Sequence, residues 1–291
     1  MAQGTIIDYI FRYSPMINTI PWKEAKNVGI KDFIRKNLPV VITDIDESLP
    51  LMTWSLEKTI SHYGSVQLRV LKGTSQYFSY SDKVEREIVT MSLAEFYDKG
   101  ISNPGLDGYF YTLGRSPIDQ FSGFSDYMVL PSSLSKFVYG YLRRPEENIW
   151  ISPKGTRTAL HFDAVENLNL QIQGSKDFYL FPPKISNMSP YPWYSQAAYV
   201  SKVDPRNSHD ATDFPFDSGV HVELQQGQML YLPYGWWHQV DTTGDRNLNA
   251  NFWWFPRTKL ITHFNQTLRG AAVLINRMGQ HPHKRAQKLK K

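Results

Sequence analysis

Three side chains in two short segments have the types and spacing needed to bind a catalytic metal ion. His161 and Asp163 lie in Thr-Ala-Leu-His-Phe-Asp, and His238 lies in Tyr-Gly-Trp-Trp-His-Gln, 75 residues after Asp163. His-x-Asp followed much later by His is the ligand order of the two-histidine, one-carboxylate triad, which leaves half of an octahedral Fe(II) open for a co-substrate and oxygen. By itself the triplet also fits zinc or hydrogen-bonded structural histidines, so the surrounding sequence has to decide.

Strand geometry would present these ligands simply. Residues i and i+2 of a β-strand face the same side, so His161 and Asp163 would project together toward one ion with Phe162 packed behind them. His238 must then come from a different strand.

The composition limits the class of protein and the kinds of metal site. The chain has 291 residues, of which 41% are hydrophobic and 14% aromatic, and this suits one globular domain with an appendage. It has no cysteine, which excludes disulfides and cysteine-ligated zinc or iron–sulfur sites, so metal ligands must be His, Asp and Glu. The sequence shows neither a signal-peptide layout nor an apolar run of about 20 residues. We expect a soluble, intracellular protein without a membrane segment, in the cytoplasm or nucleus if the source is eukaryotic.

Part of the net charge of +5 is concentrated at one end. Residues 281–291 carry five Lys or Arg and no acidic side chain. We expect a frayed, solvated terminus. The alternative is an electrostatic arm for nucleic acid or an acidic partner.

The chain divides into three parts by pattern. Residues 1–120 are expected to supply α/β elements that flank a barrel: helices at 22–25, 31–37, 53–62 and 92–99, and strands at 39–43 and 66–70. Residues 121–257 are expected to form the core. Residues 258–291 are expected to form a helix at 258–279 and then the basic tail. An apolar stripe on that helix predicts packing on its own subunit, with a homodimer as the alternative.

The core is mostly β in pattern, with many short strands that indicate a sandwich or small barrel. The clearest strand is 167–173, where Leu and Ile alternate with Asn and Gln. Gly174-Ser175 predicts a tight turn into 176–181, giving a hairpin. Further strands are expected at 220–224, 228–232, 237–242 and 247–255. Residues 186–216 look like a long ordered insert.

Two features favour a co-substrate beside the metal. The wholly polar face of strand 167–173 is unusual for a core strand unless it lines a wet cavity. Lys176 could also face inward, where burial is costly unless it meets an anion. A dicarboxylate ligand would provide that anion, and the Thr158 hydroxyl could bind the same carboxylate.

Five motifs occur in chain order in the core. They are Thr158-x-x-His161-x-Asp163-x-x-x-Asn167, Gln171-Ile-x-Gly174-x-Lys176, Leu180-Phe-Pro-Pro183, Leu232-Pro-x-Gly-Trp-Trp-His238 and Asn251-Phe-Trp253. In this order they resemble the JmjC group of 2-oxoglutarate oxygenases. They are similar in particular to the hydroxylase branch related to the asparaginyl hydroxylase that inhibits hypoxia-inducible factor. The resemblance covers residues 148–257 closely and the N-terminal part more loosely.

This resemblance implies a mainly β fold, a double-stranded β-helix (jelly roll, cupin-like), that holds Fe(II) and uses 2-oxoglutarate and O2 as co-substrates. It implies iron ligands at the triad and a co-substrate carboxylate site at Lys176 and Thr158. Asn167 and Asn251 match asparagines near the co-substrate and iron. A tyrosine usually joins the carboxylate site, and of Tyr109 and Tyr111 we prefer Tyr109.

The function implied is hydroxylation of a protein or peptide side chain, with succinate and CO2 as co-products. Hydroxylation of a modified tRNA base is the alternative, because a related family member acts on tRNA and the tail is basic. Lysine demethylation ranks lower, since the sequence has no zinc finger or chromatin-reader module. A non-catalytic cupin-like binding module ranks last.

Overall fold

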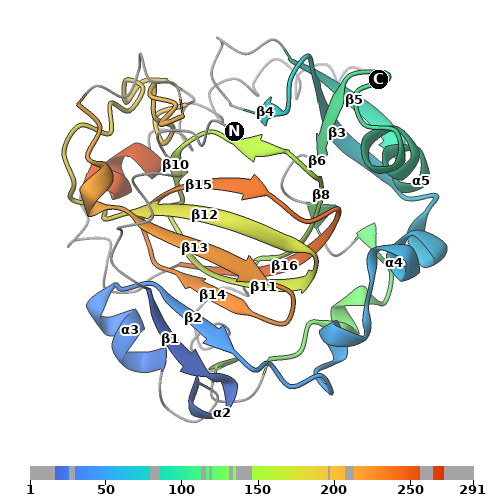
Figure 1. The fold of residues 1–291 in the computed structure, drawn as a ribbon, viewed down its shortest axis with the longest axis horizontal. Helices are drawn as coiled ribbons and strands as arrows, with labels where there is room; N and C mark the ends of the chain where they lie inside the picture. The colour runs from blue at the N-terminus through green and yellow to red at the C-terminus, as the bar shows by residue number, and fades with distance from the viewer. Residues whose placement is uncertain are drawn as a thin grey trace, which may run out of the picture.

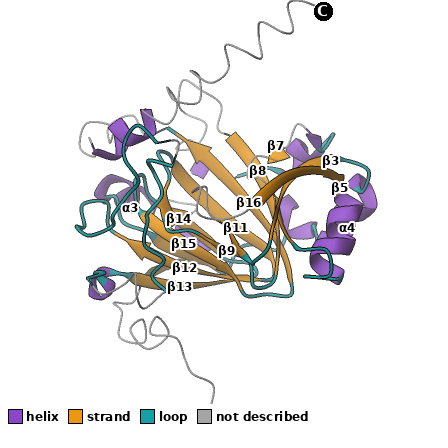
Figure 2. Cartoon of the chain, turned by 90° about the horizontal axis from the view of Figure 1, so that it is seen from above, coloured by secondary structure: helices purple, strands orange, loops and turns teal. Residues whose placement is uncertain are grey.

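Two large β-sheets packed face to face form the body of the molecule (Figures 1 and 2). The computed structural model describes residues 17–25, 30–78, 86–112, 116–117, 120–130, 134–135, 146–195, 197–206, 213–255 and 265–271. Within these residues the larger sheet has the strand order β1-β2-β14-β11-β16-β8-β7. The smaller sheet has the order β13-β12-β15-β9-β4, with β10 paired to β15. This is the expected jelly roll, so the predicted fold class is confirmed.

The strands of the larger sheet are β1 (Asn18–Pro21), β2 (Val40–Thr43), β7 (Ser116–Pro117), β8 (Glu146–Pro153), β11 (Glu166–Gln173), β14 (Met229–Leu232) and β16 (Arg246–Trp254). Those of the smaller sheet are β4 (Tyr77–Phe78), β9 (Arg157–Thr158), β10 (His161–Phe162), β12 (Ser175–Phe181), β13 (Val220–Gln225) and β15 (Trp237–Thr242). A third sheet, of order β5-β3-β6, comprises β3 (Gln67–Gly73), β5 (Arg86–Ser92) and β6 (Tyr109–Thr112).

The predicted hairpin at Gly174-Ser175 is wrong, although both strands exist. β11 pairs with β14 and β16, whereas β12 pairs with β13 and β15. The turn therefore carries the chain from one sheet to the other. Gly174 has φ +79°, and a Cβ there would lie 2.2 Å from the Arg246 carbonyl oxygen, so the crossing requires glycine. Turn chemistry predicts a reversal of direction, but it does not say which strands will pair.

The alternating pattern of β11 separates two layers of the core. Leu168, Leu170 and Ile172 pack outward into the largest hydrophobic cluster, which includes side chains of the N-terminal helices and of β3. Asn167 and Asn169 face the same side as Leu232 and Leu230, their partners on β14. Those leucines pack against side chains of β12 and β13 in the opposite sheet. The polar face of β11 therefore points between the two sheets.

The N-terminal part adds strands to both large sheets. β2 pairs with β14, β7 with β8, and β4 with β9. Helices α2 (Trp22–Glu24), α3 (Ile30–Lys36), α4 (Leu56–Tyr63) and α5 (Leu93–Phe96) lie around them.

Two helix predictions needed adjustment at their ends. The helix expected from residue 53 begins after Ser55, whose side chain accepts a hydrogen bond from the Lys58 amide, and residues Pro50–Thr53 form a 3-10 turn. α5 has the predicted capping box between Ser92 and Glu95 and then continues as a π-helical segment, Tyr97–Ser102, past Gly100. Shorter elements are 3-10 turns at Phe124–Tyr127 and Phe216–Ser218.

Of the helix expected at 258–279, residues 265–271 are helical and the others lie outside the described residues. This helix packs on its own subunit. The Thr267 hydroxyl lies 2.9 Å from that of Tyr234, and Arg269 donates to the carbonyls of Tyr191 at 2.8 Å and Ala198 at 3.3 Å. The homodimer stays a prediction. No helix in the described part of the chain is long and apolar enough to cross a membrane.

Candidate metal centre and co-substrate site

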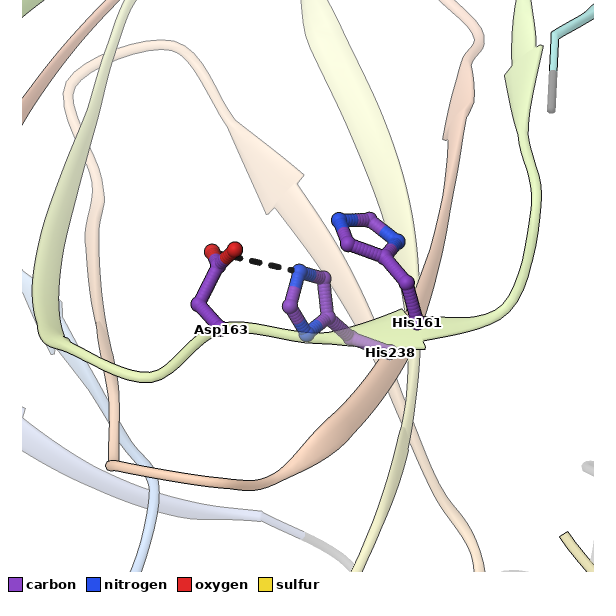
Figure 3. A group of neighbouring side chains, drawn as sticks. All are labelled: His161, Asp163 and His238. Atoms are coloured by element: carbon purple, nitrogen blue, oxygen red, sulfur yellow. Dashed lines mark ion pairs between the residues drawn. The ribbon is translucent and has the colours of Figure 1, made fainter. Parts of the chain in front are cut away.

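The three predicted ligands come together at the β10–β15 pair (Figure 3). His161 and His238 are direct partners across the two antiparallel strands, with ring centroids 4.2 Å apart. Asp163 follows β10, and its Oδ2 lies 3.7 Å from His238 Nε2. The ligand atoms of all three lie within 4.8 Å of one another, and no other such group of His, Asp and Glu occurs in the described residues.

Backbone carbonyls orient both imidazole rings. His161 Nδ1 lies 2.8 Å from the Ala159 carbonyl oxygen, and His238 Nδ1 lies 3.0 Å from that of Trp236. When Nδ1 carries the proton and donates it to a carbonyl, the lone pair is on Nε2, as a metal ligand needs. Burial, and secondarily the neighbouring His161, lowers the pKa of His238 to about 4. His238 is therefore neutral at pH 7 and able to coordinate a cation.

Lys176 is buried on the same face of the smaller sheet as His238. Lys176 and Leu180 are four residues apart on β12 and therefore share a face, and their partners on β15 are Thr242 and His238. Only 6% of Lys176 is exposed, and burial lowers its pKa to about 8. No carboxylate in the described residues contributes to that pKa. A buried ammonium without an anion is costly, and a ligand carboxylate would offset that cost.

Thr158 lies on the other side of β15 from Lys176. Its hydroxyl accepts a hydrogen bond from the Val240 amide at 3.0 Å and lies 3.4 Å from the Val240 carbonyl oxygen. Direct partners share a face, and Arg157 pairs with Asp241 on the outer face, so Thr158 faces the barrel interior. Thr158, Lys176 and His238 therefore lie on one wall of the barrel.

The opposite wall supplies buried amides. Asn251 accepts a hydrogen bond from Trp150 Nε1 at 2.9 Å, and the buried Asn167 Oδ1 has no hydrogen-bond partner among the described residues. Asn148 is fully buried, and within the described part of the chain neither polar atom of its side-chain amide has a hydrogen-bond partner. Asn148 and Asn251 are direct partners across β8 and β16. Unsatisfied buried amides facing a buried lysine suit a polar ligand between the two walls.

Sequence reasoning missed Asn148 and Trp150, which occupy the inner face of β8. The sequence pattern could have identified them, because Asn148, Trp150 and Ser152 alternate with Ile149 and Ile151 just as the amides of β11 alternate with its leucines.

The two tyrosines considered for the carboxylate site lie differently. Tyr109 stands at the start of β6, with its hydroxyl toward Gly105. Tyr111 stacks on Phe78, with ring centroids 5.2 Å apart, and its ring centroid lies 6.1 Å from that of Trp150. Phe78 is the strand partner of Thr158. Tyr111 is thus in contact with neighbours of both Thr158 and Asn251. Tyr109 packs against the same cluster of Leu71, Phe78 and Tyr111, so the preference for Tyr109 stays a prediction.

The insert supports the metal-binding strand from outside. The Phe162 amide donates to the Tyr199 carbonyl at 3.0 Å, and the Ser201 amide donates to the Leu160 carbonyl at 2.8 Å. Through these bonds, the backbone of the insert pairs with the residues on either side of His161. The stretch expected to be a long ordered insert therefore positions a ligand.

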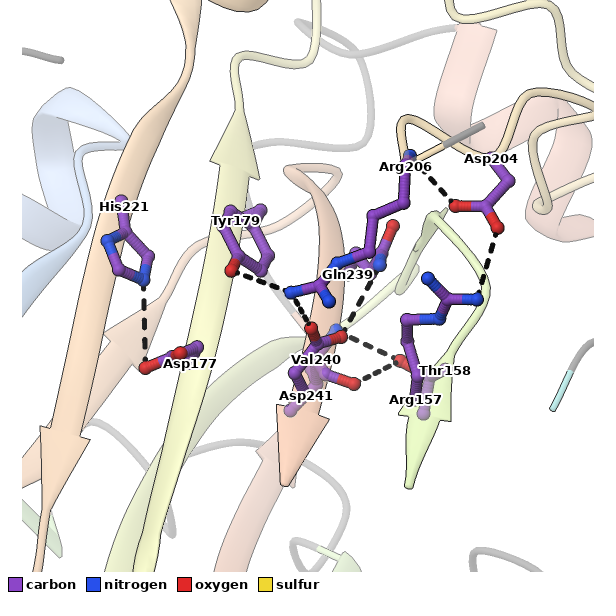
Figure 4. A network of polar contacts seen from close by, with 10 residues as sticks. All are labelled: Arg157, Thr158, Asp177, Tyr179, Asp204, Arg206, His221, Gln239, Val240 and Asp241. Carbon is purple, nitrogen blue, oxygen red and sulfur yellow. Dashed lines mark hydrogen bonds and ion pairs between the residues drawn. The ribbon is translucent and has the colours of Figure 1, made fainter. Parts of the chain in front are cut away.

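A charged network on the outer face of the smaller sheet anchors the end of this insert (Figure 4). Arg206 pairs with Asp241 on β15 and donates to the Tyr179 hydroxyl at 3.0 Å, while Asp204 pairs with Arg157 at 3.4 Å. Burial raises the pKa of Tyr179 to about 12. The network faces away from Lys176 and His238, so its role is to hold the insert.

Comparisons with known proteins agree with this architecture. Residues 25–259 match the family described as "Cupin-like domain". The chain is 30% identical to Lysine-specific demethylase JMJ30 of Arabidopsis thaliana over 235 residues, 77% of this chain and 52% of that protein. HSPB1-associated protein 1 of Bos taurus is 24% identical over 265 residues, 84% of this chain and 54% of that protein. JmjC domain-containing protein D of Dictyostelium discoideum is 39% identical over 116 residues, 38% of this chain and 24% of that protein.

The chain spans about half the length, or less, of these curated relatives. Their names support the resemblance to JmjC proteins but not to its hydroxylase branch in particular. With the jelly roll and the match over residues 25–259, the chain belongs to the cupin-like domain family.

Proposed function

We propose that the protein is an Fe(II)- and 2-oxoglutarate-dependent oxygenase that hydroxylates a protein side chain. The observation that carries this proposal is the position of Lys176. A buried ammonium on the same barrel wall as His238 supports an anion site beside the candidate metal site. A zinc hydrolase or a structural histidine cluster would have no use for that lysine.

The donor set suits both groups. His161, Asp163 and His238 offer two imidazole nitrogens and one carboxylate to Fe(II), and three protein ligands leave coordination positions for a co-substrate and O2. Lys176 and Thr158 would bind the distal carboxylate of 2-oxoglutarate, with Asn167 and Asn251 nearby. The bound iron and 2-oxoglutarate supply the oxidising chemistry, in which 2-oxoglutarate is converted to succinate and CO2. The protein's residues hold these groups in register and keep bulk water from the reacting atoms.

Lysine demethylation is the second candidate, because Arabidopsis thaliana JMJ30 and JMJ31 are named lysine-specific demethylases. The same iron site would serve both outcomes. Hydroxylation of a methyl group on nitrogen releases formaldehyde, whereas hydroxylation of carbon leaves a stable alcohol. The products therefore separate the two functions.

The test is anaerobic binding of Fe(II) and then 2-oxoglutarate, followed by exposure to air with candidate peptides. We expect succinate from the wild type and none from His161→Ala or Asp163→Ala, with circular dichroism showing that both variants are folded. A peptide that gains one oxygen atom supports hydroxylation. Loss of a methyl group with formaldehyde supports demethylation. Succinate formation at the wild-type rate by Asp163→Ala would refute the iron site.

A further inference from the structure

Glu166 is a buried carboxylate that lies outside the metal-ligand set. It is 1% exposed, at the first position of β11 and three residues after Asp163. It accepts hydrogen bonds from the Tyr231 hydroxyl at 2.7 Å and the Tyr234 amide at 3.0 Å. Both donors lie on the segment that leads into His238, so the Glu166 side chain ties the start of β11 to that segment.

The two donors belong to the connection between β14 and β15. Tyr231 is within β14, and Tyr234 lies in the turn Pro233–Trp236, which the Trp236 amide closes by donating to the Pro233 carbonyl at 3.3 Å. The next amide of the turn, that of Gly235, donates to the Asp163 carbonyl at 3.1 Å. Two consecutive amides of the turn are thus held by the segment Asp163–Glu166, which begins with a metal ligand.

The Pro233–Trp236 turn also orients the imidazole ring of His238. Trp236 is the last residue of the turn, and its carbonyl oxygen lies 3.0 Å from His238 Nδ1. Gly235 has φ +75°, a left-handed conformation that suits glycine. A chain of contacts therefore runs from the Glu166 carboxylate through the Tyr234 amide and the Trp236 carbonyl to the His238 imidazole.

We infer that Glu166 is a positioning residue for the metal centre, which holds the Pro233–Trp236 turn so that His238 meets Asp163 and His161 at one ion. The inference rests on the proposed metal site and deepens it. The carboxylate acts through the turn, and its effect is on metal affinity rather than on the chemistry of the substrate. Interactions that orient metal ligands from outside typically change metal affinity by about 10- to 100-fold.

The test is Mn(II) affinity, measured from the free-ion electron paramagnetic resonance signal, together with the melting temperature of the metal-free protein. We expect Glu166→Ala to bind Mn(II) about 10- to 100-fold more weakly. Glu166→Gln keeps an acceptor oxygen and is expected to recover part of the affinity. Tyr231→Phe removes one donor while keeping the ring and the Tyr234 bond, and it is expected to show a smaller loss. If Glu166→Ala does not fold, the Mn(II) affinity of Tyr231→Phe tests the inference by itself.

The control is Thr59→Val on α4, on the far side of the molecule from β10 (Figure 1). The buried Thr59 hydroxyl donates to the Ser55 carbonyl at 2.8 Å, so this variant also loses one buried hydrogen bond. We expect it to lower the melting temperature and leave Mn(II) affinity unchanged.

Glu166→Ala and Tyr231→Phe binding Mn(II) within about twofold of the wild type would overturn the inference. A wild type that binds Mn(II) but turns over no 2-oxoglutarate refutes the oxygenase and leaves the positioning role intact. A wild type that binds no Mn(II) refutes both.

Discussion

Replacing Lys176 by Met should stabilise the metal-free protein while it removes the anion site proposed for the co-substrate. Burial lowers the pKa of Lys176 from its ordinary value of 10.5 to about 8. A lowered pKa in the folded state means that folding disfavours the charged form. The difference of about 2.5 between the two pKa values, at 1.36 kcal/mol each, corresponds to roughly 3 kcal/mol. Methionine has a similar length and no charge to desolvate, so the variant avoids that cost.

The sign of the pH dependence follows from which state binds more protons. Below pH 8 both the folded and unfolded wild type carry the proton, and the full cost of burying the charge is present. Between pH 8 and 10.5 the unfolded chain holds the proton more tightly, so the wild type gains stability as pH rises. The advantage of Lys176→Met should fall from roughly 3 kcal/mol at pH 7 to about 1.5 kcal/mol at pH 9.5.

Urea unfolding of the metal-free proteins at both pH values measures this advantage. Lys154→Met is the matched control, because Lys154 is an exposed lysine paired with Asp245, and its removal should change stability by about 1 kcal/mol or less. Adding Mn(II) with 2-oxoglutarate at 100 times its dissociation constant should stabilise the wild type by about 2.7 kcal/mol. Lys176→Met should gain much less. A Lys176→Met protein no more stable than the wild type at pH 7 would refute the reasoning.

Three further predictions concern other parts of the molecule. Thr158→Val should weaken 2-oxoglutarate binding about 10-fold or more in calorimetry with Mn(II) present, because a hydrogen bond to a charged group is lost; unchanged affinity would remove Thr158 from the site. Arg206→Met should lower the free energy of unfolding by about 3 kcal/mol, because Asp241 stays buried without the Arg206 guanidinium. Adding Asp241→Asn should restore part of the lost stability. Equal stability of Arg206→Met and the wild type in urea would contradict this prediction. If the protein acts on tRNA, the intact protein should bind tRNA with an affinity that falls steeply as salt is added, and deleting residues 281–291 should weaken that binding. Binding by the intact protein that is absent or insensitive to salt would exclude the tRNA alternative.

Much of the core could be predicted because the local pattern and the burial agree. The alternating strand at 167–173, the capping box at Ser92 and the strands after residue 220 all appear where the sequence places them. The convergence of His161, Asp163 and His238 was also predictable, because His161 and Asp163 are two residues apart and the third candidate ligand needed only a neighbouring strand. Asp163 lies just after β10 rather than within it, so it is not a strand residue, contrary to expectation.

Other features depend on contacts between distant segments, which local patterns do not encode. The turn at Gly174 reads as a hairpin, but the two strands reach separate sheets because their hydrophobic faces pack on different partners. The sequence around Tyr109 and Tyr111 does not show how their surroundings differ, because the two residues share a strand face. The stacking of Tyr111 on Phe78 is visible only in the structure. The role of Glu166 depends on a partner 68 residues away.

The direct pairing of His161 with His238 also orders events during folding. These two ligands are 77 residues apart in the chain and meet only when β10 and β15 pair. Of the three residues of the triad, only His161 and Asp163 are close together in an unfolded chain, and long-range strand pairing is a slow step. A metal ion at the proposed site would therefore recognise the finished barrel, and we expect added iron to lengthen the lifetime of folded molecules without speeding their formation.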